Sequence, residues 1–140
     1  MKVCPGCDVL KGESGYQKNA SALSGFCTYC RECTRWQAIK ARYGLTRNEY
    51  EGIFAFQGGR CAACGTDEPG AAKGWHVDHN HGCCPGEKSC GDCVMGILCH
   101  GCNVWGDRYQ HEDFIAYRSR TGGLGQPIRA LVVQVYGLAL

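Results

Sequence analysis

The sequence predicts a small α+β domain that bound zinc stabilises, preceded by a second zinc module at the N-terminus. The chain has 140 residues with 21 glycines, and 20% of its residues are charged, so its apolar core is thin. Small domains of this kind usually need cross-links or metals. The 13 cysteines exceed what packing requires, and Cys-x2-Cys pairs begin at Cys4, Cys30, Cys61 and Cys99. Two short strand-like segments are flanked on both sides by segments of helical periodicity, which indicates the α+β class.

Two helices are expected before residue 60. The segment TRWQAIKARYG that follows Cys33 has helical periodicity, and its glycine suits a C-terminal end. A second helix begins at Thr46, because Thr46 and Glu49 have the spacing of a capping box, and it ends at the glycine pair 58–59.

Two strands and two further helices are expected in the second half. Residues 75–79 and 94–98 resemble short strands joined by a loop rich in Gly, Cys and Lys. One helix begins near Cys102 or Asn103, and another runs from about residue 112 to residue 120 before a glycine pair.

We expect three parts along the chain. Residues 1–45 form a loop-rich zinc module with a basic helix, and residues 46–122 form the domain that carries the remaining motifs. Residues 123–140 form an apolar tail, which we interpret as a core strand or a dimer-contact arm.

The bulk properties favour an intracellular protein. The N-terminus MKVCPGC shows no signal peptide, and no stretch approaches the roughly 20 apolar residues of a membrane span. Thiols stay reduced inside cells, so paired cysteines there indicate zinc sites rather than disulfides. The net charge of only +2 means that any nucleic-acid binding depends on local basic clusters.

The cysteine spacing predicts two structural zinc sites and a possible third. Two Cys-x2-Cys turns together supply the four thiolates of a tetrahedral site, which leaves no open position for water. One site is Cys61, Cys64, Cys99 and Cys102, and another is Cys4, Cys7, Cys30 and Cys33. A third set, with free thiols or a redox pair as the alternative, is Cys83, Cys84, Cys90 and Cys93, which leaves Cys27 over.

A candidate catalytic constellation lies between the second pair of cysteine turns. Neutral His79 is suited to act as a general base, and His81 lies two residues further on, where it could contact a phosphate or leaving group. Asp78 and Asn103 offer the hard oxygen ligands that Mg²⁺ or Mn²⁺ prefers. Such a set is what metal-dependent hydrolysis of a phosphodiester requires. Adjacent strand residues point to opposite faces, so we expect a strand end or a bulge at Asp78 and His79.

The same residues resemble a known family. The runs GLTRNEYEGIFAFQGGRCAACG, VDHNH and GILCHGCN are similar to the phage recombination endonuclease VII family of His-Me finger (HNH-like) nucleases, over about residues 30–106. The resemblance implies a zinc-bound ββα-metal finger within residues 46–122, with His79 as general base and Asp78 and Asn103 as Mg²⁺ ligands. It also implies a phage-encoded DNA endonuclease in a bacterial host, dimeric and acting on branched DNA such as four-way junctions.

Other functions stay open at this point. An HNH enzyme that nicks ordinary duplex, for example during phage genome packaging, would use the same residues. A zinc-bound nucleic-acid module without catalysis would use the same fold but has no need of the Asp-His-Asn set. A thiol redox or metal-storage protein would leave the His and Asn unexplained. A catalytic zinc on His79 and His81 lacks a third ligand.

A basic segment accompanies the first helix. We interpret it either as a phosphate-binding surface with interleaved aromatics or as a solvated helix face. Its residues are Arg31, Arg35, Lys40, Arg42 and Arg47.

Overall fold

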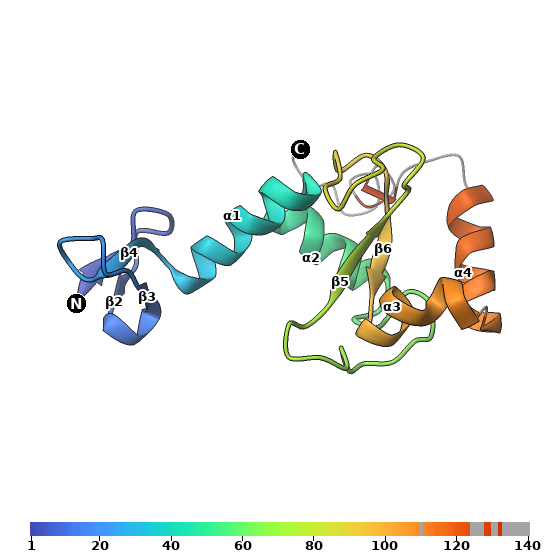
Figure 1. Ribbon diagram of the computed structural model, residues 1–140, viewed down its shortest axis with the longest axis horizontal. Coiled ribbons are helices and arrows are strands. Elements are labelled where there is room, and N and C mark those ends of the chain that lie inside the picture. The colour runs from blue at the N-terminus through green and yellow to red at the C-terminus, as the bar shows by residue number, and fades with distance from the viewer. Residues whose placement is uncertain (110, 124–127, 130–131, 133–140) are drawn as a thin grey trace. The chain divides into compact units, whose positions relative to one another are not determined.

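The computed structural model describes residues 1–109, 111–123, 128–129 and 132, and the chain divides into two compact units (Figure 1). The N-terminal unit is Met1–Ala41 and the C-terminal unit is Arg42–Leu140. The described residues form a small α+β protein with helices α1 to α4 and three two-stranded sheets. The α+β class predicted from the sequence is therefore confirmed, whereas the functional division at residues 45 and 122 stays a prediction.

The N-terminal unit is built from two antiparallel hairpins. Strand β1 (Lys2–Val3) pairs with β2 (Leu10–Lys11), and after the short helix η1 (Glu13–Gly15), β3 (Tyr16–Lys18) pairs with β4 (Phe26–Cys30). The sequence predicted a loop-rich module, and these strands of two to five residues are too short to show an alternating pattern.

The core of this unit consists of a few residues around its cysteines. Cys4, Tyr16 and Cys30 are buried, and the Tyr16 hydroxyl donates a hydrogen bond to the Lys2 carbonyl at 2.9 Å. So small an apolar core needs further support, and the clustered thiols are suited to supply it through a metal.

Two helices follow the hairpins along the chain. Helix α1 (Arg31–Tyr43) buries none of its residues, and it ends before Gly44, whose φ of +69° suits a residue without a side chain. Helix α2 (Arg47–Phe56) begins with the predicted capping box. The Thr46 hydroxyl accepts from the Glu49 amide, and the Glu49 carboxylate accepts from the Thr46 amide, both at 3.2 Å.

The C-terminal unit places a β-hairpin beside two helices. Strands β5 (His76–His79) and β6 (Val94–Leu98) pair antiparallel, and helix α3 (His100–Tyr109) follows β6 directly and packs against both strands (Figure 1). Helix α4 (Glu112–Gly123) then packs against α3. Both strands lie within one residue of their predicted bounds, and the fourth helix begins where predicted but ends three residues later, at Gly123.

The core of the C-terminal unit joins cysteines to α4. Its central cluster is Cys61, Leu98, Cys99, Phe114 and Tyr117. Gly106 lets α3 and α4 approach each other, because a Cβ atom at that position would overlap the Phe114 ring. Cys61 and Cys99 are therefore part of the hydrophobic core of this unit.

The apolar tail at residues 123–140 lies almost entirely outside the described residues, so its predicted role as a core strand or dimer arm stays a prediction. Of the helices that the structure describes, none is both long enough and apolar enough to cross a membrane.

Candidate functional site

The bulge that the sequence predicted at Asp78 and His79 is present. Asp78 pairs with Gly96, but His79 pairs with Val94, so the register shifts between the two residues and Met95 is the extra residue on β6. A bulge of this kind bends the strand and increases its twist. The Asp78 and His79 side chains are only 6% and 5% exposed. Two adjacent polar residues are thus held inside the C-terminal unit at an irregular point of the hairpin.

Asp78 is held by helix α4. Its Oδ2 accepts a hydrogen bond from the Tyr117 hydroxyl at 2.8 Å and lies 3.2 Å from the Arg118 guanidinium. Burial, together with the negative charge of Asp78, raises the pKa of Tyr117, so its hydroxyl keeps its proton and remains a donor. Gly96 makes room for that hydroxyl, because a Cβ atom there would lie 3.0 Å from it.

The sequence did not single out Tyr117 or Arg118. They lie 39 and 40 residues after Asp78, and only the docking of α4 brings them to it. The signal that could have found Tyr117 is the helical spacing of Phe114 and Tyr117, which marks one buried stripe on this helix.

The His79 ring is fixed by two backbone carbonyls. Its Nε2 lies 3.0 Å from the Cys84 oxygen and 3.0 Å from the Gly86 oxygen. Because carbonyl oxygens only accept, Nε2 carries the proton in this arrangement, and Nδ1 of the neutral ring is then the acceptor. His81 is exposed, and its ring centroid lies 4.5 Å from that of His79. The tautomer inferred from these contacts is the one that presents Nδ1 as a base.

Asn103 lies exposed in the first turn of α3. Its amide donates to the Cys99 carbonyl at 3.0 Å, and the amide of its neighbour Cys102 lies 3.4 Å from the Cys99 sulfur. The structure therefore ties the backbone of Asn103 to the cysteines of the C-terminal core. A cation shared by Asn103 and Asp78 stays a prediction.

The cysteines gather into the three sets that the sequence predicted. Within each set the Sγ atoms lie within 4.8 Å of one another. Two thiolates of a tetrahedral zinc with Zn–S bonds of about 2.3 Å lie about 3.8 Å apart. The Cys64–Cys99 and Cys90–Cys93 sulfurs are 3.8 Å apart, and Cys83–Cys90 3.9 Å. We name these sets as follows: the first group is Cys4, Cys7, Cys30 and Cys33; the second is Cys61, Cys64, Cys99 and Cys102; the third is Cys83, Cys84, Cys90 and Cys93.

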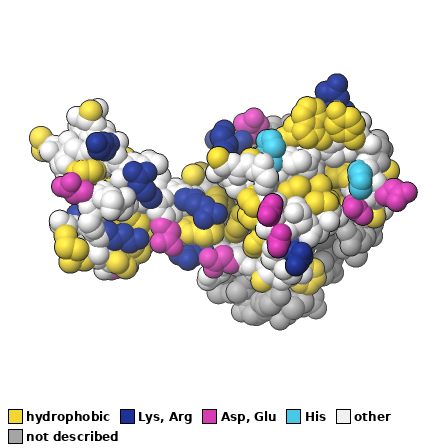
Figure 2. All heavy atoms as spheres, turned by 90° about the horizontal axis from the view of Figure 1, so that it is seen from below, with side chains coloured by type: hydrophobic (Ala, Val, Ile, Leu, Met, Phe, Trp, Pro, Cys, Tyr) yellow, Lys and Arg dark blue, Asp and Glu magenta, His cyan; other side chains and the backbone are white. Residues whose placement is uncertain are grey.

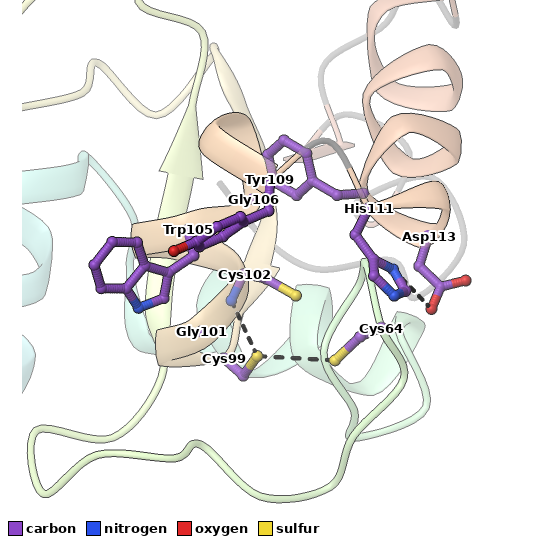
Figure 3. Close-up of a pocket in the computed structure, with 10 residues that line it drawn as sticks. Cys64, Cys99, Gly101, Cys102, Trp105, Gly106, Tyr109, His111 and Asp113 are labelled. Atoms are coloured by element: carbon purple, nitrogen blue, oxygen red, sulfur yellow. Dashed lines mark hydrogen bonds and ion pairs between the residues drawn. The ribbon is translucent and has the colours of Figure 1, made fainter.

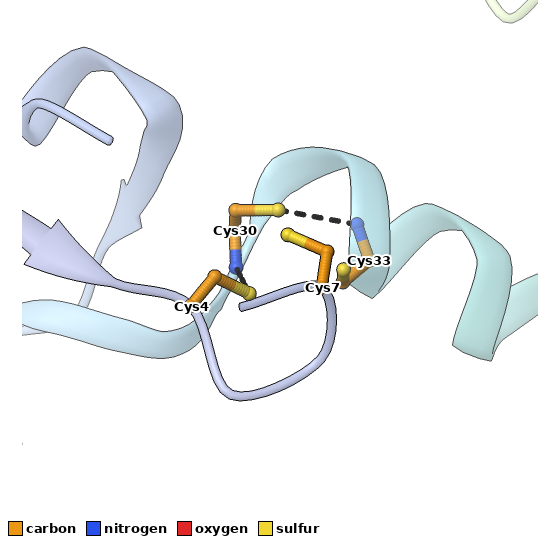
Figure 4. Close-up of side chains that lie close together, drawn as sticks. All are labelled: Cys4, Cys7, Cys30 and Cys33. Carbon is orange, nitrogen blue, oxygen red and sulfur yellow. Dashed lines mark hydrogen bonds between the residues drawn. The ribbon is translucent and has the colours of Figure 1, made fainter. Parts of the chain in front are cut away.

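The first group lies where β4 meets α1 (Figure 4). Burial alone would raise the pKa of Cys4, but hydrogen bonds from the Cys30 and Gly6 amides lower it to about 6. The pKa of Cys33 is instead raised to about 12, by burial and by its neighbouring thiols. One thiol of the group ionises easily and another resists, and a divalent cation bound among them would favour the thiolate at all four.

The third group is more open to solvent than the other two. Cys83 and Cys90 are exposed, and Cys84 and Cys93 are half-buried. Amide hydrogen bonds from Asp92 and Cys93 lower the pKa of Cys90 to about 7, whereas hydrogen bonds from neighbouring thiols raise that of Cys83 to about 12. Cys27 belongs to none of the three groups.

A pocket of about 380 Å³ opens beside the second group (Figure 3). Helix α3 contributes Trp105 and Tyr109, whose ring centroids are 5.7 Å apart, and His111 and Asp113 border it at the start of α4. Trp105 is 43% exposed at this pocket. Figure 2 shows that hydrophobic side chains also gather on the visible face of the C-terminal unit.

Taken together, the hairpin, the helix behind it and the cysteine groups define a class: a small α+β protein whose thiols are placed for zinc and whose β-hairpin carries a buried Asp-His pair. Comparison with known families makes this more specific. The family model for recombination endonuclease VII matches residues 36–119, which is more than half of the chain. The chain belongs to the recombination endonuclease VII family, which confirms the resemblance found in the sequence.

Two phage proteins are similar to the chain. The Gene 59 protein of Mycobacterium phage D29 and the Gene 59 protein of Mycobacterium phage L5 are each 41% identical to it over 76 residues. The match covers 54% of this chain and 41% of each relative, so the chain spans about two-fifths of their length. No solved structure matches the chain.

Proposed function

We propose that this protein is a Mg²⁺-dependent (or Mn²⁺-dependent) DNA endonuclease that hydrolyses phosphodiester bonds, with β5, β6 and α3 as a ββα-metal finger. The observation that carries the proposal is the pair of carbonyl contacts to Nε2 of His79, which leaves Nδ1 as the basic atom. Membership in the recombination endonuclease VII family supports the reaction class.

His79 would act as the general base. With Nε2 fixed by the Cys84 and Gly86 carbonyls, Nδ1 accepts the proton of the attacking water, and the two carbonyls stabilise the imidazolium that results. The ring is held before the reaction begins, so little reorganisation is needed at that step.

Asp78 and Asn103 would hold the divalent cation. When bound there, Mg²⁺ would supply positive charge against the charge that develops on the phosphate. The Tyr117 hydroxyl fixes one oxygen of Asp78 and so orients the carboxylate. His81, exposed beside His79, would contact the phosphate or the leaving group.

Bound zinc would be structural, in two sites or three. The first two groups each offer four thiolates with no open coordination position, and each has two cysteines buried in the core of its unit. Zinc bound in these two groups would stabilise the fold and take no part in the reaction.

DNA is the proposed partner, and helix α1 supports this choice. No residue of α1 is buried, and guanidinium groups stack on its aromatic rings: Arg35 lies 5.0 Å from the Trp36 ring and Arg42 5.6 Å from the Tyr43 ring. An exposed basic helix with interleaved aromatics suits contact with phosphates and bases. Selectivity for branched DNA, a homodimer and action in the cytoplasm of a phage host belong to the proposal as well.

One observation favours an alternative, a zinc-bound nucleic-acid module without catalysis. The guanidinium of Arg118 already lies 3.2 Å from Asp78, where a cation would have to bind. A permanent ion pair there would serve stability instead of chemistry. Nicking of ordinary duplex would, by contrast, keep the catalytic assignment and change only the substrate.

The test is cleavage of a labelled four-way DNA junction and a matched linear duplex by zinc-replete protein, with and without added Mg²⁺. We expect Mg²⁺-dependent cleavage that His79→Ala abolishes and that His111→Ala, at an exposed position, leaves unchanged. Equal cleavage of both substrates would remove the branched-DNA selectivity. Folded wild-type protein that cleaves neither would favour the binding module.

A further inference from the structure

We propose that the third cysteine group is a metal-closed latch that sets the orientation of the His79 ring. The loop between β5 and β6 would then determine whether the general base is in place, and hydrolysis would depend on the metal bound there. This inference rests on the proposed function for its effect on catalysis, but not for its effect on the histidine.

One side of the latch is the direct contact with His79. Cys84 is at once a candidate metal ligand, through its sulfur, and a partner of Nε2, through its carbonyl oxygen. The amides of Cys83 and Cys84 both donate to the Asn80 carbonyl at 3.1 Å. These hydrogen bonds form a turn directly after His79. Because the sulfur and the carbonyl belong to one residue, a metal that fixes the sulfur would also restrict the position of the carbonyl that contacts the ring.

The other side of the latch is anchored to the turn between α1 and α2. Ser89 is buried, with its amide donating to the Arg42 carbonyl at 2.8 Å and its hydroxyl to the Tyr43 carbonyl at 2.9 Å. A Cβ atom at Gly44 would lie only 2.5 to 2.7 Å from backbone atoms of Cys90 and Gly91. The half of the loop that carries Cys90 thus packs directly against the backbone of residues 42–44.

Apart from a backbone hydrogen bond at the strand ends, from the Asn80 amide to the Cys93 carbonyl at 2.9 Å, little besides a metal would connect the two halves. The residues between them are exposed, from Pro85 to Lys88, and none of the four cysteines is fully buried. The contact across the loop is made by sulfurs, with Cys83 3.9 Å from Cys90, which is the spacing of two zinc ligands. Thiols at that distance hold each other weakly, whereas a shared divalent cation would fix all four.

Loss of the metal should therefore act on the position of His79 and leave the fold in place. Misplacement of a catalytic group by about 1 Å can lower a rate by about 10²-fold. We expect the effect on kcat and little effect on KM, since the latch contacts the base.

The experiment compares Cys90→Ser/Cys93→Ser, which removes two ligands but neither residue whose carbonyl holds the His79 ring, with two variants that keep the latch. The control Cys27→Ser changes the cysteine outside all groups, and Cys90→His retains a zinc ligand. Zinc content is measured by elemental mass spectrometry, folding by thermal unfolding, and the His79 ring by ¹⁵N NMR, where a protected Nε2 proton reports the two carbonyl contacts. Cleavage kinetics are measured last.

We expect wild-type protein to hold three zinc ions and to show a protected Nε2 proton on His79. The double variant should lose one zinc and this proton's protection, and its kcat should fall by about 10²-fold. Cys90→His should restore all three signals, and Cys27→Ser should match wild type. If the double variant loses more than one zinc, Cys83→Ser takes its place.

Two results would overturn the latch: a wild-type protein with only two zinc ions, or a variant that loses the third zinc and keeps a protected His79 ring. If the NMR and zinc results are as expected but wild-type protein cleaves no DNA, the latch stands and the proposed nuclease function fails.

Discussion

The second and third cysteine groups belong to the same unit but have different surroundings. In the second group, Cys61 and Cys99 are buried in one cluster with Phe114 and Tyr117. In the third group no cysteine is fully buried, and the nearest anchor is a hydrogen-bonded serine. The second group is therefore part of the core, whereas the third is a connection between two surface segments.

Each group is also linked by a hydrogen-bonding contact to one member of the Asp-His pair. The core around the second group includes Tyr117, which donates to Asp78, and the third group includes Cys84, whose carbonyl contacts His79. The bulge puts the two residues side by side in sequence, but separate parts of the unit orient them. Stability and positioning of the base are thus expected to depend on different cysteines.

The largest expected effect is unfolding of the C-terminal unit by Cys61→Ser. A structural zinc site contributes about 10–16 kcal/mol, which equals or exceeds the whole stability of a typical domain, about 5–15 kcal/mol. Thermal unfolding with zinc analysis should show loss of the transition and of at least one zinc. Cys83→Ser is the matched control from the third group, and its melting temperature should stay near wild type. Equal destabilisation by both variants would contradict the division of roles.

Local signals made part of this architecture predictable from the sequence. The capping box at Thr46 and Glu49 depends only on residues three apart, and the cysteine groups follow from Cys-x2-Cys spacing. The bulge at Asp78 was predictable because two adjacent strand residues of one site require an irregular strand.

Tertiary packing determined what the sequence left hidden. The contacts of Tyr117 and Arg118 with Asp78 arise only when α4 docks, and the carbonyls that hold His79 belong to a loop without regular structure. Neither has a spacing that could be read from the chain.

Chelation should release the zinc of the third group before that of the second. Its ligands are exposed or half-buried, so a competing chelator can reach them, whereas Cys61 and Cys99 are enclosed. Titration with a colorimetric chelator, followed by ¹⁵N NMR of the His79 ring and by thermal unfolding, tests the order. We expect loss of protection at His79 at the first equivalent of zinc released, with the melting temperature little changed. A fall in melting temperature before any change at His79 would reverse the order.

Tyr117→Phe should weaken the unit by a smaller amount. It removes the hydroxyl that donates to the buried Asp78 carboxylate at 2.8 Å, and hydrogen bonds to charged groups contribute about 1.5–3 kcal/mol. Denaturant unfolding of zinc-replete protein measures the difference. Tyr109→Phe is the matched control, because Tyr109 is 68% exposed. If Tyr117→Phe were as stable as Tyr109→Phe, the hydrogen bond from Tyr117 to Asp78 would not contribute to stability. The proposed link from the second group to Asp78 through Tyr117 would then be wrong.

The smallest expected effect is a pH dependence at His76, where β5 meets α3. Burial, and then the nearby His100, Arg42 and Lys73, lower the pKa of His76 below 6.5, and its Nε2 lies 3.3 Å from Nδ1 of His100. His76 therefore binds a proton more readily in the unfolded chain than in the folded one. Above pH 6.5 the residue has no effect on the free energy of unfolding. As the pH falls through and below 6.5, protonation of His76 in the unfolded chain lowers the stability of the folded protein. Because the site is partly solvated, the shift in melting temperature should be about 1–2 °C, a fraction of the 4–8 °C expected for 1 kcal/mol. His76→Gln should show a shallower fall in melting temperature from pH 7 to pH 5.5 than wild type, with His111→Gln as the exposed control. Protonation of the thiolates affects all three proteins alike. If melting temperature fell equally with pH in wild type and in His76→Gln, the pKa of His76 would not contribute to the pH dependence of stability.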